Sequence, residues 1–128
     1  MILPNDVAEL CNTQLWKVDP TGSNWIAPGH QNNNDEDWLV QLYDSEDSVR
    51  FALSSFLELG FTFDSNIHYQ ELAYEFMSFK REKVNLIVTR SPEFATKWRA
   101  ATNICKALNV TEKAERIRLF RAALYNEV

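Results

Sequence analysis

Two short motifs in the first third of the chain carry residue types that could bind a nucleotide together with a metal ion. The pair Gly22-Ser23 is followed, after eleven residues, by the acidic triplet DED, in which Asp35 and Asp37 flank one residue. The triplet leads into the apolar segment WLV, which is typical of a strand entering a core. Because side chains alternate along a strand, both carboxylates should share one face, with Cα atoms about 6–7 Å apart. Such a pair can hold Mg²⁺ or Mn²⁺, with water and substrate phosphates completing the shell.

The Gly-Ser pair suits the phosphates of the same ligand. A turn that ends one strand and opens a short helix exposes backbone N–H groups, and these bind phosphate oxygens. Gly22 would allow close approach, and Ser23 would add a hydroxyl donor. Each motif alone is common, since an acidic triplet is usually a solvated loop end. Their combination and spacing favour a nucleotide site.

This combination resembles the DNA polymerase beta-like nucleotidyltransferase superfamily. There, a Gly-Ser turn and a short helix precede D-x-D on the next strand, and a later strand adds a third carboxylate. More narrowly, the chain resembles small nucleotidyltransferase-like proteins encoded by bacteriophages. The matching blocks are TGS, DEDWLV, ELGF, EFMSFKREKVNLIVT and ATNICKALNVTEKAERIRLFRAALY, which cover most of residues 20–125. The resemblance implies that Gly22 and Ser23 hold the phosphates of a nucleoside triphosphate and that Asp35 and Asp37 ligate the metal.

The third acid of the superfamily is missing. Its place on the predicted strand VNLIV is taken by Asn85, and the resemblance to the bacteriophage group extends to this asparagine. A neutral carbonyl in place of a carboxylate weakens metal binding and gives no general base for the acceptor. Glu36 also departs from the superfamily, whose middle residue is usually apolar. We expect Glu36 to be exposed or paired with a base such as Lys80.

Further candidates lie at a predicted hairpin tip, on the last helix and in the loop after Ser23. Lys80 is expected to bind the nucleotide, and with Arg81 and Lys83 it could neutralise a triphosphate, although charged turn tips are common. Trp25 could stack on a base, and His30 could donate to a phosphate. Four bases of the last helix could contact a nucleic-acid backbone or only form the polar side of an amphipathic helix: Lys113, Arg116, Arg118 and Arg121.

The hydrophobic pattern predicts the elements that must position these residues. We expect a helix over 7–14, a strand in LWKV closed by Asp19-Pro20, a short helix after Ser23, and a strand in DWLVQLY. A helix over 46–59, a brief strand in FTF and a hairpin over 75–89 follow. Ser91-Pro92 starts a helix, and Thr111 caps the last one, through 126. The predicted fold class is α/β (α+β), the minimal nucleotidyltransferase fold implied by the resemblance: one domain over 1–128, a small mixed sheet covered by helices, and two C-terminal helices.

Charge is divided along the chain. Residues 1–78 hold 13 acidic and two basic side chains, whereas residues 79–128 hold 11 basic and five acidic ones. The basic part could face an anionic partner, such as a nucleic acid or a host protein, or the two parts could attract each other. No membrane span or signal peptide is recognisable, so we expect a cytoplasmic protein, in the host cell if a bacteriophage encodes it. Cys11 and Cys105 are expected to be reduced, buried thiols.

Three functional hypotheses remain open. The first is a Mg²⁺-dependent transfer of a nucleoside monophosphate from a nucleoside triphosphate to a hydroxyl on a protein, an RNA or a small molecule. The second is a catalytically weak or inactive module that binds a nucleotide or a host protein, because Asn85 replaces an acid. The third is a structural subunit without a ligand. A chain of 128 residues leaves little room for an acceptor-binding domain, so a partner or a homodimer could supply that surface.

Overall fold

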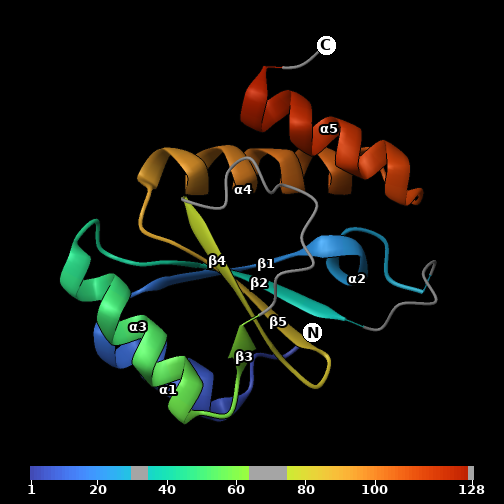
Figure 1. The fold of residues 1–128 in the computed structure, drawn as a ribbon. Coiled ribbons are helices and arrows are strands. Elements are labelled where there is room, and N and C mark those ends of the chain that lie inside the picture. The colour runs from blue at the N-terminus through green and yellow to red at the C-terminus, as the bar shows by residue number, and fades with distance from the viewer. Residues whose placement is uncertain (30–34, 64–74, 127–128) are drawn as a thin grey trace.

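The fold is a mixed five-stranded sheet with helices on both faces (Figure 1). The computed structural model describes residues 1–29, 35–63 and 75–126. In order across the sheet, the strands are β1 (Lys17–Thr21), β2 (Glu36–Gln41), β5 (Val84–Thr89), β4 (Phe76–Arg81) and β3 (Thr62–Phe63). The helices are α1 (Asn5–Gln14), α2 (Gly22–Ile26), α3 (Glu46–Glu58), α4 (Pro92–Ala107) and α5 (Lys113–Tyr125). The predicted fold class, with a small mixed sheet and two C-terminal helices, is therefore confirmed.

Strand pairing aligns the polar residues of three strands. β2 and β5 are parallel, whereas β1–β2, β5–β4 and β4–β3 are antiparallel. In this register Asp37 of β2 lies opposite Thr21 of β1 and opposite Asn85 of β5. The parallel pair is central in the sheet, so its residues are covered by helices on both faces.

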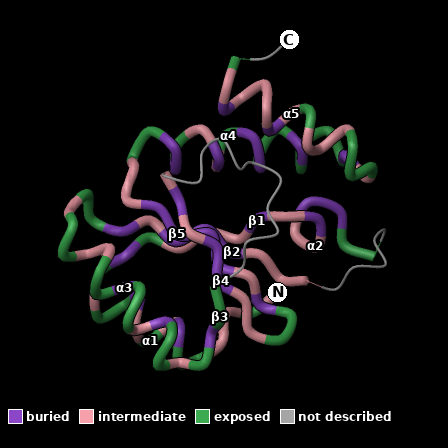
Figure 2. The backbone as a smooth tube through the Cα atoms, in the orientation of Figure 1, coloured by how far each residue is buried: buried purple, intermediate pink, exposed green. Residues whose placement is uncertain are grey.

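Each face of the sheet has its own hydrophobic core. In Figure 1, α4 and α5 cover one face together with the short α2, and α1 and α3 cover the other. On the α4 side, Trp98 packs edge-on against Phe120 of α5 at 4.8 Å and stacks on Phe94 at 5.5 Å, measured between ring centroids. On the α3 side, Phe56 packs against Phe79 at 5.5 Å. Figure 2 shows the buried residues concentrated along the central strands and the inner sides of the helices.

Two helices begin as the sequence predicts. Ser45 accepts a hydrogen bond from the Ser48 amide (3.1 Å) at the start of α3, and Ser91 accepts one from the Phe94 amide (3.1 Å) at the start of α4. These contacts satisfy donors that a helix start otherwise leaves unpaired. The other two long helices differ: α1 begins at Asn5, two residues early, and α5 begins after Glu112 rather than after Thr111.

β1 runs further than predicted. It continues through Asp19 and Pro20 to Thr21, and α2 begins directly at Gly22 without a separate turn. Proline is compatible with a strand here because β1 is an edge strand and one side of it needs no ladder donor. The longer strand brings Gly22 to the end of the sheet, directly beside β2.

The apolar stripes of α3 and α4 do not coincide with their buried faces. Helical spacing places Leu53, Leu57 and Leu108 on these stripes, but they are 37%, 48% and 66% exposed. α3 instead buries Ala52 and Phe56, one position further round the helix. Periodicity finds an amphipathic helix but does not fix the width of the face that its neighbours cover.

Ion pairs join the acidic and basic parts of the chain. Arg81 Nη1 lies 2.7 Å from Asp6 Oδ2, and Arg99 Nε lies 2.6 Å from Asp19 Oδ2. The other pairs of this kind are Lys80–Asp35, Lys83–Glu36, and Arg90 with both Asp44 and Glu46. Among the described residues, the charge division thus serves contacts within the fold, which was one of its two interpretations.

Both cysteines are free and buried, as expected. Burial raises the pKa of the Cys11 thiol to about 11 and also raises that of Cys105. Reactive thiolates are therefore scarce at neutral pH. None of the helices in residues 1–29, 35–63 and 75–126 is long and apolar enough to cross a bilayer.

A buried hydrogen-bond relay ties α4 to the end of β1. Thr102 Oγ1 donates to the Trp98 carbonyl (2.9 Å). In the 2.7 Å contact between Thr102 and Thr21, the Thr21 hydroxyl is therefore the donor. Thr21 also accepts from Trp98 Nε1 (2.9 Å). The relay fixes the residue immediately before Gly22.

Thr102→Val is expected to lower the free energy of unfolding by about 1–3 kcal/mol, because the buried Thr21 hydroxyl loses its acceptor while the side-chain shape is kept. Urea denaturation measures the change. Thr62→Val is the matched control: its hydroxyl donates to the Lys80 carbonyl (3.2 Å) at an exposed position, so the loss should stay within about 0.5 kcal/mol. Equal losses in the two variants would contradict a structural role for the relay.

Candidate functional site

The candidate site lies at the end of the sheet where β1 ends and β2 and β5 begin, on the face covered by α4. Leu39 and Ile87 belong to the α4-side core. Because side chains alternate along strands, Asp37 and Asn85, each two residues earlier, point to the same face. Gly22 and the other predicted site residues flank them.

Gly22 lies directly against Asp37. A Cβ atom on Gly22 would be 1.9 Å from Asp37 Oδ2, and the Gly22 φ is +78°. Both facts require glycine, since L-residues rarely adopt this backbone and the carboxylate occupies the space of a side chain. The Gly-Ser motif and the D-x-D motif, fifteen positions apart at Gly22 and Asp37, are thus adjacent in space.

Asn85 binds the acid opposite it. Asn85 Nδ2 donates to Asp37 Oδ1 (3.0 Å), and Ser78 Oγ donates to Asn85 Oδ1 (3.1 Å). Asn85 thus offers a neutral donor to the carboxylate. Since a hydroxyl both donates and accepts, Ser78 would also satisfy the opposite amide orientation, in which the Asn85 carbonyl faces the site.

Lys80 reaches the other acid. Lys80 Nζ lies 3.0 Å from Asp35 Oδ2, and both side chains are partly exposed. Glu36 pairs with a base, as one of the two expectations had it, but the base is Lys83, at 3.8 Å, rather than Lys80. Lys80 therefore lies beside the site, where it can also meet an anionic ligand.

Arg81 is held away from the site. Its Nη1 donates to the Asp6 carboxylate (2.7 Å) and to the Leu59 carbonyl (2.8 Å) on the α1 and α3 face. Strand alternation is the reason, because neighbours on β4 point to opposite faces. The structure thus assigns Lys80, but not Arg81, to the candidate site. Predicted His30 lies outside the described residues.

The electrostatics of Asp37 favour a bound cation. The pKa of Asp37 is raised to about 6, chiefly by burial and also by the nearby Asp35 charge, against the Asn85 hydrogen bond and the positive charges of Arg116 and Lys80. The ionised carboxylate is therefore poorly compensated by the protein alone. The carboxylates of Asp35 and Asp37 are oxygen donors of the kind that Mg²⁺ prefers.

The protein supplies only part of a metal shell. Within the described residues, no group of three His, Cys, Asp or Glu side chains gathers in one place. Asp35 and Asp37 could therefore hold Mg²⁺ only with water and ligand oxygens in the remaining positions, which is the usual arrangement for this ion. The residues fit a cation that arrives with a polyphosphate better than one held permanently.

Comparisons with models of protein families, with curated proteins and with solved structures find no match to this chain. A function must therefore be argued from the chemistry of the site.

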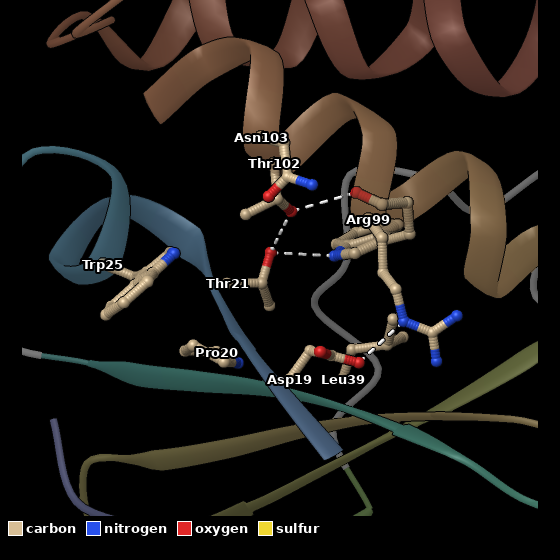
Figure 3. Close-up of a pocket in the computed structure, with 9 residues that line it drawn as sticks. Asp19, Pro20, Thr21, Trp25, Leu39, Arg99, Thr102 and Asn103 are labelled. Carbon is tan, nitrogen blue, oxygen red and sulfur yellow. Dashed lines mark hydrogen bonds and ion pairs between the residues drawn. The ribbon is translucent and has the colours of Figure 1, made fainter. Parts of the chain in front are cut away.

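A cavity of about 160 Å³ lies beside Thr21, between β1, α2 and α4 (Figure 3). Its lining residues are Asp19, Pro20, Thr21, Trp25, Leu39, Trp98, Arg99, Thr102 and Asn103. Trp25, predicted to stack on a base, borders this cavity. Lys106 Nζ lies 4.1 Å from the centroid of the Trp25 ring and donates to the Trp25 carbonyl (2.7 Å). The ring is thus partly covered by a cation.

Sequence reasoning missed two residues of the site region: Ser78 orients Asn85, and Thr102 fixes the end of β1. Arg116, whose charge acts on Asp37, was a candidate only for contact with a nucleic-acid backbone. The Ser78 signal was present, because it alternates with Lys80 on the strand opposite Asn85. Ser23, which follows Gly22 in α2, is 5% exposed.

Proposed function

We propose that this protein is a Mg²⁺-dependent nucleotidyltransferase that moves a nucleoside monophosphate from a nucleoside triphosphate to a hydroxyl acceptor. The observation that carries the proposal is the contact between Gly22 and Asp37, which unites a phosphate-binding motif with a metal-binding motif. Lys80 beside Asp35 supports it, as does the resemblance to the DNA polymerase beta-like superfamily. The acceptor could be a nucleic acid, a host protein or a small molecule.

The reaction is a phosphoryl substitution. The acceptor oxygen forms a bond to the α-phosphorus, the bond from that phosphorus to the bridging oxygen breaks, and pyrophosphate leaves. Bound Mg²⁺ supplies charge neutralisation on the phosphate oxygens. The protein binds and orients the substrate, which accounts for much of catalysis in phosphoryl transfer.

Each residue of the site has a distinct task in this reaction. Gly22 leaves Asp37 Oδ2 uncovered, and Ser23 offers a hydroxyl to a phosphate oxygen. Lys80 exchanges its Asp35 contact for the negatively charged substrate. Asn85 holds Asp37 in place but accepts no proton, so the acceptor proton passes to water.

The hydrogen bond from Asn85 Nδ2 to Asp37 favours the second candidate, a binding module with weak or no activity. Asn85 Nδ2 faces Asp37, so the protein itself partly compensates a charge that a second metal ion would otherwise neutralise. A superfamily site with its third acid has both a metal ligand and a base at this position; here Asn85 provides neither in the orientation observed. Such a module would still bind the nucleotide with Mg²⁺.

Asp35→Asn and Asp37→Asn are expected to reduce nucleotide transfer by roughly 100-fold or more, because each removes a charge that holds the metal. The assay incubates the protein with labelled nucleoside triphosphates, Mg²⁺ and host extract. Glu36→Gln is the matched control: it removes the acid between them, which pairs with Lys83, and it should retain transfer within about twofold.

The outcomes separate the hypotheses. Transfer lost in both aspartate variants supports the enzyme. Mg²⁺-dependent nucleotide binding by calorimetry, without transfer by the wild type, supports the binding module. A protein that neither transfers nor binds, and whose melting temperature Mg²⁺ and nucleotide leave unchanged, overturns both.

A further inference from the structure

One arginine of α5 occupies a position where the helix should be apolar. Phe120 and Leu124 lie four residues apart and are 2% and 7% exposed, on the side of α5 that packs against α4. Arg116 is the next residue of this stripe, four positions before Phe120, in the first turn of α5. A charged side chain thus continues the buried face of the helix.

Arg116 carries a buried donor without an acceptor. Its Nη1 atom is enclosed and has no hydrogen-bond partner in the part of the chain described by the structure. A buried, unsatisfied donor is costly, more so on a charged group. Other arginines are satisfied: Arg118 donates to both carboxylate oxygens of Glu115 (2.7 Å each), and Arg99 donates to Asp19 (2.6 Å). An acceptor for Arg116 Nη1 is therefore missing from the residues that the structure describes.

The guanidinium lies on the side of the sheet that carries the acids. The positive charge of Arg116 acts on the carboxyl group of Asp37 and on the thiol of Cys105, which belongs to α4. Asp37 does not accept a hydrogen bond from it, since the bond observed at Asp37 Oδ1 comes from Asn85. Arg116 is therefore close enough for its charge to act on Asp37, although the two residues belong to different elements.

We propose that Arg116 binds the polyphosphate of the nucleotide, as the donor that α5 contributes opposite Asp35 and Asp37. This inference rests on the proposed function and extends it by one residue. The missing partner must be an acceptor, and phosphate oxygens accept the two parallel bonds that a guanidinium fork offers. A ligand bridging the metal-binding acids and Arg116 would satisfy the enclosed Nη1.

The test compares the full-length wild type with Arg116→Met and Arg118→Met. Calorimetry measures the binding of inorganic tripolyphosphate and of a nucleoside triphosphate, each with Mg²⁺. Arg116→Met should weaken both by about tenfold or more, the usual effect of losing a charge-assisted pair. Arg118→Met is the matched control on the same helix and should stay within about twofold, because Arg118 pairs with Glu115.

A second readout distinguishes ligand binding from a structural role. Without ligand, Arg116→Met should melt no lower than the wild type, since the enclosed and unsatisfied donor is replaced by an apolar chain of similar length. Mg²⁺ with tripolyphosphate should then raise its melting temperature less than that of the wild type. Arg116→Gln, which keeps a polar side chain, should show the same loss of binding and provides the measurement if Arg116→Met unfolds.

Each remaining outcome has a clear consequence. Unweakened tripolyphosphate binding in Arg116→Gln and Arg116→Met overturns the inference and leaves the proposed function intact. No binding of either ligand by the wild type overturns both. Loss confined to a single-stranded oligonucleotide, with tripolyphosphate binding unchanged, also overturns the inference, because Arg116 would then bind a phosphodiester backbone.

Discussion

Gly22→Ala should lower the free energy of unfolding by about 2–4 kcal/mol and abolish Mg²⁺-dependent nucleotide binding. Two causes add. An alanine at φ +78° is strained, and its Cβ would be 1.9 Å from Asp37 Oδ2 and 2.8 Å from the Asp37 Cβ, so the acid must move. Denaturant unfolding measures the first effect, and calorimetry with a nucleoside triphosphate measures the second.

Gly29→Ala is the control that separates the two causes. Gly29 has a similar φ of +83°, but a Cβ there meets nothing within 4 Å. Its loss should be limited to the backbone strain, about 1–2 kcal/mol, and nucleotide binding should persist. If Gly22→Ala destabilises no more than Gly29→Ala, or still binds nucleotide, the close contact between Gly22 and Asp37 is not needed for stability or for nucleotide binding.

Combining Gly22→Ala with Asp37→Ala tests the same contact in a second way. Removing the Asp37 carboxylate eliminates the 1.9 and 2.7 Å contacts and leaves only the one to the Cβ atom. The double variant should therefore lose less stability than the two single losses added together, since residues in contact are not independent. Additive losses would indicate that the clash is relieved elsewhere.

The grouping of Gly22, Asp37 and Asn85 was expected from the resemblance to the nucleotidyltransferase superfamily, not from local patterns alone. Alternation along a strand places Asp35 and Asp37 on one face. The pairing of β2 with β5 joins Asp37 to Asn85 across 48 positions, and no local pattern specifies it.

The contribution of α5 was not accessible in the same way. Helical spacing groups Ala114, Ile117, Phe120 and Leu124 into an apolar stripe with Arg116 beside it, but Ala114 is exposed and Arg116 continues the buried face. Apolar residues on neighbouring rows make the rotation of a helix ambiguous, and only its packing on α4 selects one face. The sequence alone therefore does not show that Arg116 lies within the buried face of α5.

The cavity beside Thr21 illustrates a second limit. Asp19 and Arg99 border it from residues 80 positions apart and are joined by a hydrogen bond of 2.6 Å. No sequence motif predicts the pair of Asp19 and Arg99, because it depends on how α4 crosses β1. In both cases the missed residues lie on long-range contacts, whereas the predicted ones lie within neighbouring strands.

Replacing Asp37 by a neutral residue should stabilise the fold at neutral pH, and the gain should disappear at acidic pH. Without divalent metal, the folded-state pKa of Asp37 is about 6, because burial and the Asp35 charge disfavour its ionised form, against 3.8 for an unperturbed carboxyl. The folded protein therefore binds more protons than the unfolded chain between about pH 4 and 6, and this residue lowers stability as the pH rises through that window. Above it, the full penalty of about 1–3 kcal/mol remains, for a carboxyl that is only partly buried.

Asp37→Asn removes this penalty while retaining an oxygen that can accept from Asn85 Nδ2. In a chelating buffer the variant should match the wild type near pH 4 and exceed its unfolding free energy by about 1–3 kcal/mol at pH 7. Asp47→Asn, at an exposed side chain, should differ from the wild type by less than about 0.5 kcal/mol throughout. Mg²⁺ with tripolyphosphate at pH 7 should then stabilise the wild type but not Asp37→Asn, because only the ionised carboxylate attracts the cation. A variant less stable than the wild type at pH 7 would mean that Asp37 is retained for the fold rather than for a ligand.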